Sequence, residues 1–176
     1  MNTCEDSKLI SGLLYISKML LERGVRPDIH RIFKIMYFAD KESLKLYKQP
    51  VFGGFCAIPY GPVQDELYKI IKKCRDGKSN CCDFEVIDKM FINPLNDYDS
   101  DEFSQSDFEC LDKSISENAN LTFEELKNKS HDAAYENTAI GYPMNLLDIA
   151  SASGLNQDEI EYIKEVEQNR YLLVEE

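Results

Sequence analysis

Two histidines and six cysteines are the side chains of this 176-residue sequence best suited to nucleophilic or metal chemistry. A nucleophilic triad would have to recruit His30 or His131 together with a serine or cysteine and an orienting acid, and neither histidine lies in a known nucleophile signature. His131 follows Ser130 at the end of an expected helix, where a histidine ordinarily hydrogen-bonds a terminal carbonyl. We therefore expect a protein that is not an enzyme. The alternative is an enzyme that pairs Cys56 or a serine with His131.

The sequence offers little for a metal, a cofactor or a disulfide. Cys74, Cys81 and Cys82 could join a histidine around zinc, but they lack the paired CxxC spacing of structural zinc sites. The acidic run 97–102 lacks the glycine and the final glutamate of a calcium-binding loop, and no glycine-rich phosphate loop occurs. We expect no metal and no cofactor. A chain of this size does not need disulfides, so the cysteines are expected to be reduced thiols.

The charge and hydropathy of the chain exclude two classes of partner. Its net charge of −12 opposes binding to nucleic acid, because a phosphate backbone must be neutralised by clustered Lys and Arg. No stretch reaches the roughly 20 apolar residues of a membrane-spanning helix, and residues 1–8 are polar, unlike a signal peptide. We therefore expect a cytoplasmic protein with no membrane partner.

The first third of the chain has the periodicity of two helices. Apolar residues at helical spacing predict a helix over residues 7–23, and a second helix begins after Pro27 with Asp28 as its N-cap. If this second helix continues to Tyr47, its basic side chains fall on one stripe, which is either a solvated face or a contact surface. The residues of this stripe are His30, Lys34, Lys41, Lys45 and Lys48.

The middle of the chain combines β-forming residues with turn signals. Residues 50–58 are consistent with a short hairpin or a kinked strand. Gly61 and Pro62 then resemble a helix start, and that helix is expected to end near residues 75–77. Residues 84–92 are expected to form one further strand.

The rest of the chain has helix-start signals. Residues 106–109 and 122–125 have the spacing of capping boxes, a short apolar helix is expected at 145–152, and Asn156 with Glu159 begins the last helix. We predict an α+β fold, predominantly helical, with helices packed around a small antiparallel β-sheet or hairpin. Without a repeat or linker, residues 1–176 are expected to form a single domain.

Three ordered segments resemble the Panacea domain, the antitoxin SocA-like family, whose relatives include phage-associated proteins. The segment 32–40 ends in Tyr-Phe-Ala-Asp, the segment 50–63 contains Tyr-Gly-Pro-Val, and the segment 121–131 ends in Ser-His. The resemblance is strongest over residues 9–135. The family usually has a tryptophan shortly after Ser-His, and this chain has Tyr135 there and no tryptophan.

The resemblance implies an antitoxin of a toxin–antitoxin system. Such a protein neutralises a cognate toxin, generally encoded by an adjacent gene, by direct protein–protein binding. The alternative is an adaptor that delivers its partner to a cytosolic protease. Several motif residues could equally fix the fold, since a glycine cap and a helix-start proline are structural devices. The residues expected to bind the partner are Lys34, Tyr37, Asp40, Tyr60, Gly61, Pro62, Tyr68 and His131.

Overall fold

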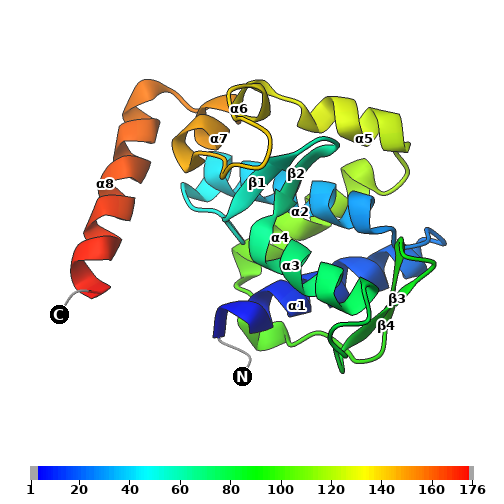
Figure 1. Ribbon diagram of the computed structural model, residues 1–176. Coiled ribbons are helices and arrows are strands. Elements are labelled where there is room, and N and C mark those ends of the chain that lie inside the picture. Colours follow the sequence, from blue (N-terminus) through cyan, green and yellow to red (C-terminus); the bar gives the residue numbers. More distant parts are fainter. Residues whose placement is uncertain (1–3, 175–176) are drawn as a thin grey trace.

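A computed structural model describes residues 4–174 of the chain, with the side chains of residues 7–170. Helices dominate the described chain, and the strands pair as two separate antiparallel hairpins (Figure 1), so the predicted helix-rich α+β class is confirmed. The elements are α1 (Cys4–Glu22), α2 (Ile29–Tyr47), β1 (Phe55–Ile58), β2 (Gly61–Gln64), α3 (Asp65–Arg75), β3 (Phe84–Ile87), β4 (Phe91–Pro94), the 3-10 turn η1 (Ser100–Glu102), α4 (Gln105–Asn118), α5 (Phe123–Ser130), α6 (Ala133–Glu136), α7 (Leu146–Ala152) and α8 (Gln157–Val174).

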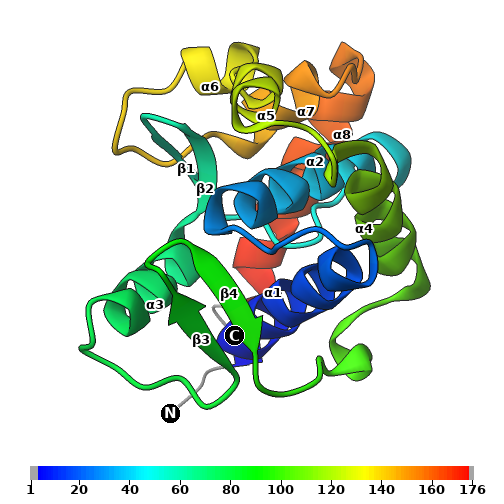
Figure 2. The same ribbon diagram turned by 90° about the vertical axis from the view of Figure 1, so that its right-hand side faces the viewer.

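Helix α2 lies at the centre of the fold. It begins where predicted, because the Asp28 carboxylate accepts a hydrogen bond from the Arg31 backbone N–H at 2.8 Å. The helix packs against α1, α4, α5, α7 and β2, and Figure 2 shows it between α1, α3 and β3–β4 on one side and α5, α6 and α7 on the other. The expected solvated stripe is therefore wrong at Lys34, which is only 1% exposed. Periodicity identifies one apolar face, but neighbours cover α2 on more than one side.

The segment after Gly54 is a hairpin rather than the start of a helix. Strands β1 and β2 pair antiparallel with Ile58 opposite Gly61, so Pro59 and Tyr60 form the two-residue turn. The prediction that Gly61-Pro62 opens a helix is wrong by three residues. Helix α3 begins after Gln64, whose side chain accepts the Leu67 N–H at 2.8 Å, and it ends at Arg75 as expected.

Residues 84–92 form most of a second hairpin, not the single strand that we expected. Strands β3 and β4 pair antiparallel with Ile87 opposite Phe91, so Asp88, Lys89 and Met90 connect them, with φ values of 52° at Asp88 and 60° at Lys89. Asp88 and Lys89 both have left-handed backbone, and the Met90 N–H donates to the Ile87 carbonyl at 3.1 Å. β-propensity predicted the strands, but none of these residues is the glycine or asparagine that usually marks such a turn.

One of the predicted capping boxes is misplaced. Helix α4 starts from a capping box of Ser104 and Asp107, not from residues 106–109, because an aspartate takes the place usual for glutamate. The capping box of Thr122 and Glu125 is confirmed at α5. The short helix α7 and the final helix α8 also lie where predicted, and Figure 1 shows α8 along one side of the molecule. Within residues 4–174, no helix combines the length and the apolarity needed to cross a bilayer.

Candidate functional site

The three sequence motifs meet in space beneath the turn between β1 and β2. Gly61 has a φ of 107°, and a Cβ atom at this position would lie 2.6 Å from Ser130 Oγ and 2.8 Å from Lys34 Cε. Real Cβ atoms do not approach other atoms so closely, so the packing here requires glycine. The helix motif, the Tyr-Gly-Pro-Val motif and the Ser-His motif thus form one contact.

Lys34 is a buried cation that holds this turn. Its Nζ donates a hydrogen bond to the Pro62 carbonyl at 2.9 Å, and no carboxylate of the described residues forms an ion pair with it. Burial lowers the pKa of Lys34 to about 7, because desolvation disfavours the charged form. The histidines near it, His30 and His131, also have pKa values lowered by burial. Lys34 therefore shapes the turn from inside the protein.

Replacement of Lys34 by Met is expected to remove a pH dependence of stability. The folded pKa of about 7 lies below the ordinary lysine pKa of 10.5, so the unfolded chain binds more protons between these pH values. Lys34 therefore lowers the free energy of unfolding most strongly below pH 7, and this destabilisation decreases as the pH rises. Relative to Lys34→Met, the wild type should gain about 2 kcal/mol in unfolding free energy between about pH 7 and pH 9.

Urea unfolding of both proteins at the two pH values measures this difference. The raised thiol pKa values of Cys56 and Cys110 also affect stability in this range, but both proteins carry these cysteines, so their effect cancels. Parallel pH profiles for the two proteins would show that Lys34 stays charged in the folded chain.

A second buried network ties α2 to the segment after Ser130. The Tyr37 hydroxyl donates to the Asp132 carboxylate at 2.9 Å, and Lys41 Nζ lies 2.5 Å from the same carboxylate. Burial and the neighbouring Asp132 raise the pKa of Tyr37, so its hydroxyl remains a donor. Asp132 also caps α6 by accepting the Tyr135 N–H. Tyr37 is fully buried and positions this segment.

Asp40 holds the loop that precedes β1 in a fixed position. Its carboxylate accepts the backbone N–H groups of Val51, Phe52 and Gly53 at 2.7–3.0 Å. Burial raises the pKa of Asp40 to about 7, while the three donors act in the opposite direction. This aspartate therefore fixes the approach of the chain to the β1–β2 hairpin.

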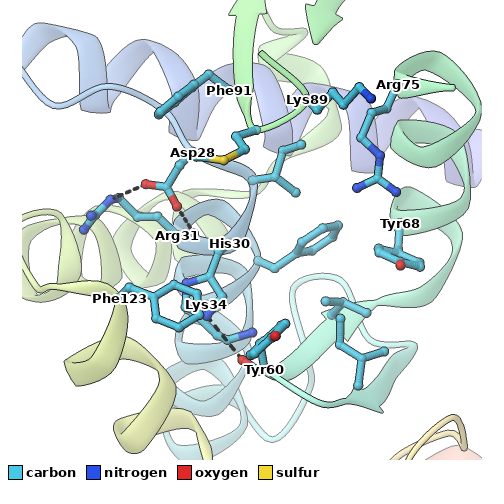
Figure 3. A pocket seen from close by; sticks show the side chains of 15 residues that line it. Asp28, His30, Arg31, Lys34, Tyr60, Tyr68, Arg75, Lys89, Phe91 and Phe123 are labelled. Carbon is cyan, nitrogen blue, oxygen red and sulfur yellow. Dashed lines mark hydrogen bonds and ion pairs between the residues drawn. The ribbon is translucent and has the colours of Figure 1, made fainter. Parts of the chain in front are cut away.

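Above these buried clusters lies a hollow of about 550 Å³, which we call the aromatic groove. The start of α2, the β1–β2 hairpin, α3, the β3–β4 turn and the start of α5 enclose it (Figure 3). Its size is that of a pocket for a small molecule or an anchoring side chain. The residues that line it are Asp28, Ile29, His30, Arg31, Phe33, Lys34, Ile58, Tyr60, Val63, Tyr68, Arg75, Lys89, Met90, Phe91 and Phe123.

Large apolar side chains stand exposed around the aromatic groove. Tyr60 is 57% exposed, Met90 56% and Phe123 43%. The Tyr60 and Phe123 rings pack edge to face at 5.7 Å, and the His30 ring lies 4.1 Å from Phe123. Burial lowers the pKa of His30 to about 4, so its ring is neutral near pH 7 and extends this apolar surface. Exposed apolar side chains gathered at a hollow are typical of a binding surface.

The groove carries positive charge although the chain is acidic. Asp28 is neutralised by Arg31, whose Nε lies 2.9 Å from its carboxylate. Arg75 makes only a long contact of 3.8 Å to Asp76, and no ion pair of Lys89 is formed within the described side chains. In Figure 3, Arg75 and Lys89 lie at one end of the groove, with His30, Tyr60 and Phe123 at the other. An anionic group is therefore favoured at the Arg75 end.

The structure also places the residues considered for catalysis or metal binding. His131 stacks on Tyr135 at 4.1 Å, and the Tyr135 hydroxyl donates to the Ile58 carbonyl. The Cys56 thiol donates to Asp65, and burial raises its pKa to about 11, which disfavours the nucleophilic thiolate. Across residues 7–170, no three His, Cys, Asp or Glu side chains gather as a metal site. The Cys4 side chain lies outside the described residues.

The predicted partner-binding residues fall into two groups. Tyr60 and Tyr68 line the aromatic groove, and Tyr60 is exposed. Lys34 is buried but still forms part of the groove wall. The remaining residues lie in or beside the buried clusters. These remaining residues are Tyr37, Asp40, Gly61, Pro62 and His131. Their role in partner binding stays a prediction.

Sequence reasoning missed the far wall of the groove. Phe123, Met90 and Lys89 come from turns that are distant in sequence from Tyr60, so no motif spacing connects them. No local signal marks these residues, because they reach the groove through the packing of α5 and of the β3–β4 turn around α2.

Comparisons with known proteins give one match. The family model described as "Antitoxin SocA-like, Panacea domain" matches residues 32–137, which is more than half of the chain. This range contains the three motifs and every residue that lines the groove except those at the very start of α2. Searches of curated proteins and of solved structures found no match.

Proposed function

This chain belongs to the antitoxin SocA-like, Panacea domain family, and we propose that it is an antitoxin that neutralises a protein toxin by direct binding. The gene beside it is the natural source of that toxin, and we call the product of that gene the neighbour protein. The aromatic groove is the proposed contact surface. The observation that carries this assignment is the group of exposed apolar side chains, Tyr60, Met90 and Phe123, around a hollow lined by further rings.

Physical chemistry supports this surface as a protein interface. Aromatic side chains are enriched among the residues that contribute most to protein binding, because they bury a large area at a low cost in conformational entropy. Tyr60 projects from a two-residue turn, and its position is fixed by the buried Lys34–Gly61–Ser130 contact. In this proposal Tyr60 and Tyr68 touch the toxin. The buried residues Lys34, Tyr37, Asp40, Gly61 and Pro62, together with the partly buried His131, hold the surface in shape.

We further propose that the whole chain is one domain. One cluster of buried side chains extends from Leu9 in α1 to Ile163 in α8, which supports this proposal. Helices α7 and α8 lie beyond the family match, so the match does not describe this part of the chain.

Co-expression tests the antitoxin function. Induction of the neighbour protein alone is expected to stop growth, and co-expression of this chain should restore it with a stable complex between the two proteins. Loss of cytosolic proteases should leave the level of the neighbour protein unchanged if neutralisation is simple blockade. A neighbour protein that is harmless alone and does not co-purify with the chain would contradict the proposal.

A further inference from the structure

We propose that the aromatic groove receives a segment of the partner protein in which an apolar side chain is accompanied by carboxylates, with the carboxylates meeting Arg75 and Lys89. This inference rests on the proposed function, because it assumes a protein partner. It adds the chemistry of the segment that the partner presents. The apolar side chain would fill the hollow between Phe33, Tyr60 and Tyr68.

The apolar part of the segment follows from the walls of the groove. A hollow of about 550 Å³ accommodates a large side chain together with part of its backbone, and its walls are mainly aromatic and aliphatic. Phe33 is buried at its base, while Tyr60 and Phe123 stand exposed at its rim. An inserted apolar side chain would remove these rim surfaces from water, which is favourable in proportion to the area covered.

The acidic part follows from the charges of the groove. Among the described residues that line it, Asp28 is the one acid, and it is held by Arg31 and by the first turn of α2. Arg75 contacts Asp76 only at 3.8 Å, and Lys89 forms no ion pair within the described side chains. On a chain of net charge −12, this local excess of cations favours an anionic segment.

Other occupants fit these observations less well. A basic segment would meet Arg75 and Lys89 with like charge, which costs binding free energy. Single-stranded nucleic acid also stacks on aromatic rings, but it needs a basic track for several phosphates, and this acidic chain repels it at longer range. A partner segment that combines an apolar side chain with carboxylates therefore matches the groove best.

Charge reversal at the rim tests the inference. The double variant Arg75→Glu, Lys89→Glu is expected to bind the purified neighbour protein about 30-fold more weakly than the wild type. The matched control is Lys45→Glu, Lys164→Glu, which changes the net charge by the same amount at exposed positions outside the groove. The control should change the affinity by less than about threefold. Calorimetric titration measures both values.

Two further measurements separate a loss of charge attraction from poor folding of the double variant. The single variant Lys89→Glu, at an exposed turn residue, should show part of the loss even if the double variant folds poorly. Added salt should weaken wild-type binding and have less effect on the double variant. Equal affinity of the double variant and the control, or tighter binding by the double variant, would overturn the inference while leaving the antitoxin function intact.

The remaining outcomes are also distinct. If the wild type does not bind the neighbour protein at all, the proposed function fails rather than the chemistry of the segment. Binding of a labelled oligonucleotide that is lost in Arg75→Glu, Lys89→Glu would instead identify nucleic acid as the occupant and overturn the inference.

Discussion

Alanine at both Tyr60 and Phe123 is expected to weaken binding of the neighbour protein by roughly 100-fold or more and to abolish neutralisation in cells. The two rings pack edge to face at the rim of the aromatic groove, so the double replacement removes a joined surface. An aromatic anchor at the centre of an interface commonly contributes about 2 kcal/mol, so two full losses would correspond to nearly ~1000-fold. Two rings in contact do not contribute independently, so the expected decrease is smaller but still about 100-fold or more. Titration calorimetry and growth rescue measure the two effects.

The control for this variant uses exposed apolar residues away from the groove. Leu46 is 54% exposed at the end of α2, and Tyr162 is 55% exposed on α8. Alanine at both positions removes similar side chains and should leave affinity and growth rescue close to wild type. The groove would lose its assigned role if the control abolished binding and the Tyr60, Phe123 variant bound normally. Thermal unfolding of both variants shows whether each is folded.

Replacement of Gly61 by Ala is expected to lower the unfolding free energy by about 3–5 kcal/mol. Its φ of 107° strains any residue with a Cβ atom, and the new atom would collide with Ser130 Oγ and Lys34 Cε. Lys34 cannot move away without losing its hydrogen bond to the Pro62 carbonyl. Urea unfolding should show the loss, and the displaced turn should weaken partner binding through Tyr60.

Gly141 provides a control that separates backbone strain from crowding. Its φ is 88°, but nothing lies within 4 Å of the position of its Cβ. Gly141→Ala should therefore cost only about 1–2 kcal/mol from the backbone. Adding Ser130→Ala to Gly61→Ala removes the nearest colliding atom and should restore part of the stability. Equal losses in Gly61→Ala and Gly141→Ala would show that the three motifs are not in close contact.

Local patterns identified the longer helices, but they did not identify the turns or the short helix α6. The apolar period and the cap at Asp28 predicted α2, because these interactions lie within one turn of helix. Gly61-Pro62 was misread as a helix start, since a glycine followed by proline suits both a cap and a strand after a tight turn. The pairing of Ile58 with Gly61 decides between them, and pairing depends on the partner strand.

The site was predictable only in the part that the motifs contain. The sequence singled out Tyr60, Tyr68 and Lys34, and these line the aromatic groove. It also placed Lys34 on a basic stripe that was expected to be a solvated face or a contact surface, because periodicity does not reveal how many neighbours surround a helix. Phe123 and Lys89 reach the groove through the packing of α5 and the β3–β4 turn around α2, which no local pattern encodes.

Hydrogen–deuterium exchange of the chain with and without the neighbour protein tests the central claim most directly. Binding in the aromatic groove should slow exchange in the turn between β1 and β2, in the turn between β3 and β4 and in the first turn of α5. Exchange along α8 should not change. Protection confined to α8 would contradict the claim that the groove binds the toxin. A complex that neutralises toxicity without protecting these three segments would contradict it as well.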